Sequence, residues 1–167
     1  MGFLEAIENS GIATWVRESP SIFAYTTVLS LHAMGLAIVV GTSVVIALRL
    51  LGFANGIPIA NVLKLYPIMY LGFTVNAISG LLLLAANATG MLTNTAFIVK
   101  MVFIVIAMVV MELIRARLGQ ASTVGAAEAS SGASRGLAVV AIAVWGAAII
   151  AGRLTAYPNF LSSLFGF

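Results

Sequence analysis

The sequence contains no cysteine, no aspartate and a single histidine, and only 8% of its 167 residues are charged. Without cysteine there is no disulfide, no thiolate metal site and no cysteine nucleophile. The five acidic residues are all glutamates, too few for a carboxylate metal cage or a paired-acid hydrolase site. These absences exclude most classes of soluble enzyme, and we assign no catalytic residue to the chain.

Apolar residues dominate what is present. They make up 62% of the sequence, whereas soluble domains carry about 25% charged residues. The length leaves room for four membrane-spanning helices of ~20 residues with their connections, but for no separate soluble domain. The net charge of +3 forms no basic stripe, so we expect the lipid bilayer rather than nucleic acid as the partner.

Uncharged runs and helix-start signals divide the chain. Ser19-Pro20 reads as the beginning of the first span, and Tyr66-Pro67 as that of the second. The expected spans cover about 20–49, 66–87, 95–116 and 135–157. Residues 3–17 suit an interfacial helix with a break near Gly11, and the small polar residues of 118–134 favour a flexible loop. The predicted fold is a single all-α domain over 1–167, an integral membrane four-helix bundle of up-down-up-down topology.

Basic residues set the expected orientation. One side of the membrane collects Arg49, Lys64, Arg115, Arg117 and Arg135, and the other has Arg17, Lys100 and Arg153. The excess favours a cytoplasmic location for the first group. We therefore expect a multi-pass protein of the bacterial inner membrane with both termini periplasmic.

His32 is the strongest candidate for a functional residue, because an ionisable side chain near the middle of a span is costly in lipid. Imidazole is a common ligand of haem iron, and Gly35, one turn further on, leaves space for a flat ring. Arg17, Lys100 and Arg153 approach the same side of the membrane and can pair with haem carboxylates. The sequence thus predicts a b-type haem, with His32 as its metal ligand, in an electron-transfer subunit of a respiratory or redox complex.

The sequence leaves several candidates for the second axial ligand of the haem iron. Met34, Met91 and Met101 are candidates, and so is His32 of a second copy in a homo-oligomer.

Each of these residues also has a simpler interpretation. His32 can hydrogen-bond to a neighbouring helix, for example to Asn76, and only fix the packing. Lys100 and Arg153 suit interfacial anchors. Glu112 has Arg115 three residues later, as in an intrahelical ion pair.

Two other functions are consistent with the sequence. The small residues Ala33, Ala37 and Gly41 recur at helix-packing spacing, as in a non-catalytic accessory subunit that packs against other membrane subunits. A small transporter or channel would need a continuous polar path, and the few polar residues within the spans, His32, Asn76 and Glu112, are too sparse to form one.

Two segments carry a resemblance. Ser30 to Gly41, which includes His32-x-x-Gly35-Leu-Ala, and Gly152-Arg153-Leu-Thr-Ala-Tyr157 together resemble an uncharacterised family of small four-helix bacterial inner-membrane proteins, over residues 15–158. That family implies the fold but no function, and its members have a further histidine where this chain has Arg115. The His-x-x-Gly helix is also distantly similar to the first helix of membrane cytochrome b-like and copper-resistance-like proteins.

Overall fold

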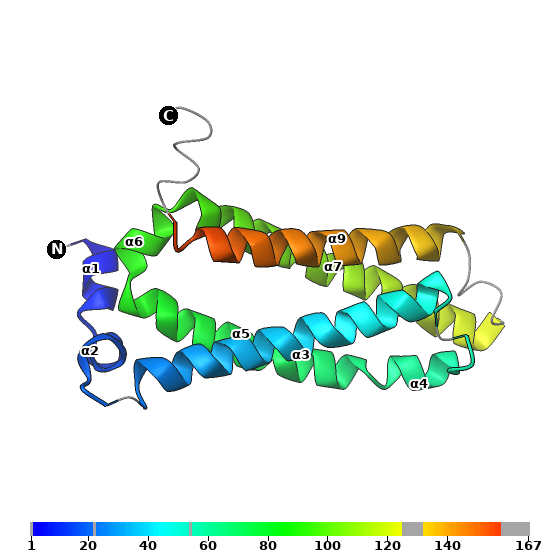
Figure 1. Ribbon diagram of the computed structural model, residues 1–167, viewed down its shortest axis with the longest axis horizontal. Helices are drawn as coiled ribbons and strands as arrows, with labels where there is room; N and C mark the ends of the chain where they lie inside the picture. The colour runs from blue at the N-terminus through cyan, green and yellow to red at the C-terminus, as the bar shows by residue number, and fades with distance from the viewer. Residues whose placement is uncertain (1, 22, 54, 125–131, 158–167) are drawn as a thin grey trace.

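The computed structural model describes the whole chain except residues 1, 22, 54, 125–131 and 158–167. The regular secondary structure of the described part is all helical and includes four long apolar stretches, shown in Figure 1. These are Tyr25–Leu51, Ile59–Ala86, Thr95–Gln120 and Gly132–Leu154. Each has at least 23 residues, whereas about 20 suffice to cross a bilayer. The prediction of an all-α four-helix bundle is confirmed.

The long helices form two antiparallel pairs. The first pair is α3 (Tyr25–Leu51) with α5 (Tyr66–Ala86), and the second is α7 (Thr95–Val124) with α9 (Gly132–Leu154). The short helix α4 (Ile59–Leu63) connects α3 to α5, and the short helix α6 (Ala88–Leu92) connects α5 to α7. We call the end with α4 the loop end, and the end with α6 the cap end.

Three boundaries differ from the prediction. The first span was expected to begin at Ser19-Pro20, but Ser19 is the C-cap of α2 (Gly11–Glu18), and α3 begins at Tyr25. Residues 118–134 were expected to form a loop, but α7 continues to Val124 and α9 already begins at Gly132. Alanine and glutamine are good helix formers, so the small, polar composition of this stretch did not prevent helix. The rest of the expected loop lies outside the described residues.

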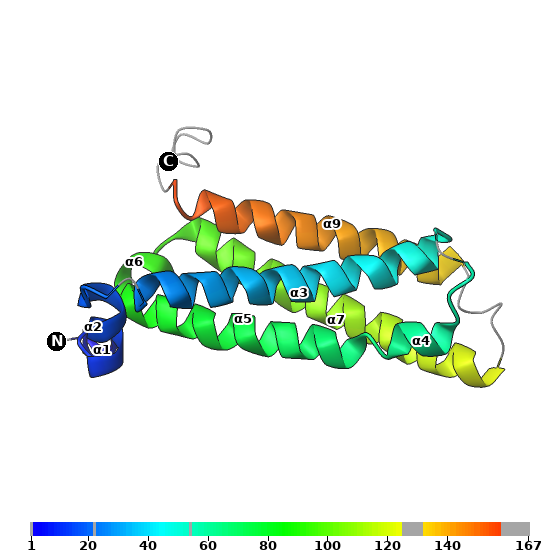
Figure 2. The same cartoon turned by 60° about the horizontal axis from the view of Figure 1, so that its bottom comes forward.

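The N-terminal segment forms α1 (Phe3–Glu8) and α2 (Gly11–Glu18), which lie across the cap end (Figures 1 and 2). The expected break occurs, and Ser10 explains its position. The Ser10 hydroxyl accepts a hydrogen bond of 3.4 Å from the backbone N–H of Ala13, which caps α2.

The main apolar core occupies the loop-end half of the bundle and its middle. It contains the following buried residues: Val39, Ile46, Ala47, Leu50, Val62, Tyr66, Met69, Ala107, Val110, Met111, Ile114, Leu118, Ala138, Ala141, Trp145 and Ala148. Towards the cap end the α3–α5 pair and the α7–α9 pair diverge, as both ribbon views show. The loop-end half therefore holds the two pairs together.

Glycines bring α3 and α5 into close contact. A Cβ added to Gly35 would lie 2.6 Å from the backbone nitrogen of Asn76, and one added to Gly72 would lie 2.9 Å from that of Val39. The space beside Gly35, which the sequence suggested for a flat ring, is thus filled by the backbone of α5. Gly35 serves helix packing instead.

Candidate functional site

His32 and Asn76 join α3 to α5 through a reciprocal pair of hydrogen bonds. Nδ1 of His32 lies 3.0 Å from the backbone oxygen of Asn76, and the Asn76 side-chain amide donates to the backbone oxygen of His32 at 2.7 Å. Ser79 also lies within 3.3 Å of Nδ1. The interpretation that His32 bonds to the helix bearing Asn76 is confirmed.

This contact defines the state of the His32 ring. A carbonyl oxygen only accepts hydrogen bonds, so Nδ1 carries the proton when the ring is neutral. The lone pair is then on Nε2, for which no described residue supplies a hydrogen bond. A histidine held in this way by a backbone carbonyl is oriented as metal-ligating histidines are.

Lys100 lies on the inward side of α7, five residues from its cap-end start. It lies on the face of α7 that carries Ala107 and Met111, both 0% exposed, at spacings of seven and eleven residues. Its side chain is partly buried, and its ammonium has no hydrogen-bond or ion-pair partner among the described residues. Among the described residues, this cation of a membrane-spanning helix therefore has no counter-charge.

His32 and Lys100 lie at the same height in the bundle. The Tyr70 hydroxyl on α5 donates to Glu112 on α7, which aligns these antiparallel helices. Gly80, which lies beside the His32 ring, is ~15 Å from that contact towards the cap end along α5. Lys100 is ~18 Å from the same contact, in the same direction, along α7.

A glycine lies beside each of these two side chains. A Cβ on Gly80 would lie 3.0 Å from Cε1 of His32, and one on Gly152 of α9 would lie 3.3 Å from Cδ of Lys100. Each pair of helices thus contributes one long polar side chain and one glycine. We call this set, completed by two polar residues of α5, the polar layer. Its members are His32, Asn76, Ser79, Gly80, Lys100 and Gly152.

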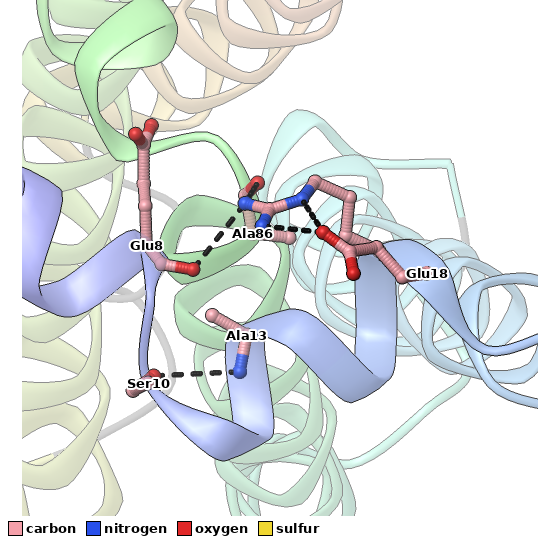
Figure 3. Close-up of polar contacts among 6 residues, drawn as sticks. Glu8, Ser10, Ala13, Glu18 and Ala86 are labelled. Atoms are coloured by element: carbon pink, nitrogen blue, oxygen red, sulfur yellow. Dashed lines mark hydrogen bonds and ion pairs between the residues drawn. The ribbon is translucent and has the colours of Figure 1, made fainter.

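Arg17 lies on α2 and makes three contacts at the cap end (Figure 3). Its guanidinium donates to the backbone oxygens of Glu8 and Ala86, both at 3.3 Å, and pairs with Glu18 at 2.8 Å. Its donors are therefore used to fasten α2 to the ends of α1 and α5. It does not join the polar layer.

Arg153 also lies outside the layer. It is exposed, and its guanidinium carbon sits 5.8 Å from the centre of the Tyr157 ring. Such a pair suits a membrane interface, as the alternative interpretation of Arg153 proposed.

The three methionines considered as second axial ligands do not reach the layer. Met34 lines an outward-facing groove of about 320 Å³ on the side of α3 away from His32. Met91 belongs to α6. Met101 is 44% exposed and lies about 100° around α7 from Lys100. Within the described residues, the layer offers one strong haem ligand.

At the loop end, Glu112 and Arg115 form the predicted ion pair, with an N–O distance of 3.5 Å. Arg115 also lies over the rings of Tyr66 and Tyr70, which the sequence did not suggest. The Tyr66 hydroxyl donates to the backbone oxygen of Met111. These groups satisfy one another, and the apolar core separates them from the polar layer.

The fold and the hydropathy of the long helices define a multi-pass helical membrane protein. Comparison of the chain with models of known protein families, with curated proteins and with solved structures finds no match. The polar layer is therefore assessed on its own chemistry.

Proposed function

We propose that this chain is an electron-transfer subunit that binds a b-type haem at the polar layer, with His32 as axial ligand and Lys100 as partner of a haem carboxylate. The support comes from one observation: within the described residues, the Lys100 ammonium has no partner, and it lies at a similar height to a His32 ring whose Nε2 accepts no hydrogen bond. A cation in a membrane helix costs about 2.5–3.5 kcal/mol at the centre of a span and less at the position of Lys100, five residues from the start of α7. A bound carboxylate would offset that cost.

The donor set fits this group. A haem supplies one-electron redox chemistry, for which the protein provides an axial ligand, charge partners and a low-dielectric setting. Asn76 fixes the His32 ring so that Nε2 is the ligating atom. Gly80 and Gly152 make room for the His32 and Lys100 side chains themselves. Since Arg17 is used at the cap end, Lys100 is the carboxylate partner.

The first test is optical. The protein is purified in mild detergent with haem supplied, and reduced-minus-oxidised visible spectra are recorded. We expect a difference spectrum that shows bound haem b. His32→Ala should abolish it and Lys100→Met should weaken haem binding about tenfold or more, whereas Met34→Leu should have no effect.

A second measurement checks that haem occupies the bundle interior. Trp145 is 2% exposed in the core, whereas Trp15 is 53% exposed at the cap end. In a Trp15→Phe background, haem titration should quench the Trp145 fluorescence saturably. Folded protein with no band and no quenching would remove the haem proposal.

The orientation belongs to the same proposal. The loop end carries Arg49, Lys64, Arg115, Arg117 and Arg135, which favours the cytoplasmic side of a bacterial inner membrane. The cap end and the N-terminus are then periplasmic. Because the chain has no native cysteine, single cysteines at Gly2 and Asn55 can be tested with a membrane-impermeant thiol reagent. We expect intact spheroplasts to label the first and not the second.

One observation favours a second candidate function, that of an accessory subunit. Ala33, Ala37 and Gly41 lie exposed on α3, and a Cβ on Gly41 would meet nothing within 4 Å. Small residues facing outward let another transmembrane helix approach closely. If this function holds, Ala37→Leu and Gly41→Leu should release a co-purifying membrane subunit while His32→Ala has no effect.

A further inference from the structure

We infer that the loop end of the bundle binds the head groups of anionic phospholipids, and that the guanidinium groups of Arg117 and Arg135 contact their phosphates. This surface is separate from the polar layer and does not depend on haem binding. The lipid is assigned to one end of the bundle and not to a compartment, so either orientation in the membrane is consistent with it.

The two ends of the bundle differ in charge. Among the described residues of the loop end, Glu112 is the only acidic one, against five basic residues. Basic residues still predominate when Glu128 is counted, which follows α7 in the sequence outside the described residues. At the cap end the basic and acidic residues are equal in number: Arg17, Lys100 and Arg153, and Glu5, Glu8 and Glu18. We call the loop-end set the basic band; its members are Arg49, Lys64, Arg115, Arg117 and Arg135.

The basic band lies at the level of lipid head groups. At about 1.5 Å per residue, its members are ~28–36 Å along their helices from the cap-end termini of those helices. These termini are Tyr25, Ala86, Thr95 and Leu154. The hydrocarbon core of a bilayer is about 30 Å thick. When the cap-end termini lie at one membrane surface, the basic band therefore lies at the other, where the phosphates are.

Two members of the band have unused hydrogen-bond donors. Arg117 and Arg135 are exposed, and neither has a hydrogen-bond or ion-pair partner among the described residues. The other three members are bonded to residues of the same end of the protein. A guanidinium has five N–H donors and no acceptor, and it binds phosphate through paired hydrogen bonds. Arg117 and Arg135 are therefore the members available to a lipid phosphate.

The charge of the band selects the class of lipid. Clusters of Lys and Arg next to membrane-spanning helices attract anionic head groups. A zwitterionic head group adds a cation beside its phosphate, which the other members of the band repel. Leu113 is 50% exposed and lies one turn before Arg117 on the same face of α7. It is thus placed to contact the acyl chains of a lipid whose phosphate is bound by Arg117.

The experiment compares lipid contact at the two ends of α7. Leu113→Trp reports on the loop end and Ile98→Trp on the cap end, because the native side chains are 50% and 51% exposed. Both are made in a Trp15→Phe background, in which the remaining Trp145 is only 2% exposed. The full chain is reconstituted in phosphatidylcholine vesicles that contain a minor fraction of either phosphatidylglycerol or phosphatidylcholine with brominated acyl chains. Bromine quenches tryptophan fluorescence on contact.

We expect brominated phosphatidylglycerol to quench Leu113→Trp about twofold or more strongly than brominated phosphatidylcholine does. The two lipids should quench Ile98→Trp equally. Adding Arg117→Gln and Arg135→Gln to Leu113→Trp should remove the difference, whereas adding Arg153→Gln, which changes an exposed cation of the cap end, should preserve it. Salt at about 1 M should weaken the difference, because it screens exposed charges.

Three results would overturn the inference. Equal quenching of Leu113→Trp by the two lipids would show that the loop end does not select anionic lipid. An equal preference for phosphatidylglycerol in Ile98→Trp would show that the preference does not belong to the loop end. A preference that persists in the variant with both Arg117→Gln and Arg135→Gln would remove these two residues as the phosphate ligands. Because no haem is present in these measurements, none of the results bears on the proposed function.

Discussion

The side chain of Asn76 is bonded to the backbone oxygen of His32, while the ring of His32 is bonded to the backbone oxygen of Asn76. Each residue thus uses its side chain to hold the main chain of the other's helix. The contact lies next to the place where Gly35 meets the backbone of α5. Orientation of the ring and packing of the two helices therefore depend on the same pair.

The first prediction concerns this pair. Asn76→Ala should lower the free energy of unfolding by about 1 kcal/mol, because interhelical hydrogen bonds in membranes contribute about 0.6–1.7 kcal/mol. His32→Ala should give a similar loss, and the double variant should lose about the sum, because each bond ends on a backbone oxygen that alanine retains. Denaturant titration in mixed micelles measures all three. Native stability in both single variants would contradict the reciprocal contact.

The second prediction concerns the helix crossing. Gly35→Val should destabilise the protein by about 2 kcal/mol or more, because its Cβ would collide with main-chain atoms of Asn76 and Gly72 that cannot move aside separately. Gly41→Val is the matched control on the same helix, with open space around it. Equal melting temperatures for the two variants would show that α3 and α5 are not in close contact.

The third prediction concerns Lys100. Lys100→Met removes an unpaired cation from the bundle interior, so the ligand-free variant should be more stable than the native protein by about 1 kcal/mol or more. Thermal unfolding in nanodiscs measures this. Arg153→Met, which changes an exposed cation, should show no gain. A less stable Lys100→Met variant would indicate that the ammonium has a partner.

The fourth prediction concerns the cap. Arg17→Gln should raise the hydrogen exchange rate of the α1 and α2 amides about fivefold, because it removes an ion pair and two bonds to helix-terminal carbonyls. The amides of α9 should be unaffected. Unchanged protection of α1 and α2 would mean that the apolar contacts of Val16 alone hold the cap.

Some of this architecture was readable from the sequence. The uncharged runs and Pro67 located the long helices, because a bilayer requires about 20 apolar residues in succession. The face of α7 that Lys100 occupies was also accessible, since Lys100 shares the helical spacing of Ala107 and Met111, which are buried. The sequence left Lys100 with two interpretations, a carboxylate partner and an interfacial anchor.

Other features depended on contacts that one sequence cannot show. From the sequence alone, the space beside Gly35 can hold either a ligand or a neighbouring helix. The position of the Asn76 backbone shows that a helix fills it. Arg17 was grouped with Lys100 and Arg153 because all three approach one side of the membrane. Its bond to Ala86, 69 residues away, is what removes it from the layer.

The uneven core also gives the bundle a mechanical property. Because the main core joins the two helix pairs at the loop end and in the middle, we expect the pairs to move relative to each other mostly at the cap end, and His32 lies ~20 Å along α3 from Ile46 in that core. A relative rotation of about 3° about the core would move the His32 ring by ~1 Å relative to Lys100. Since membrane thickness changes the tilt of transmembrane helices, we expect it to change the distance between these two residues.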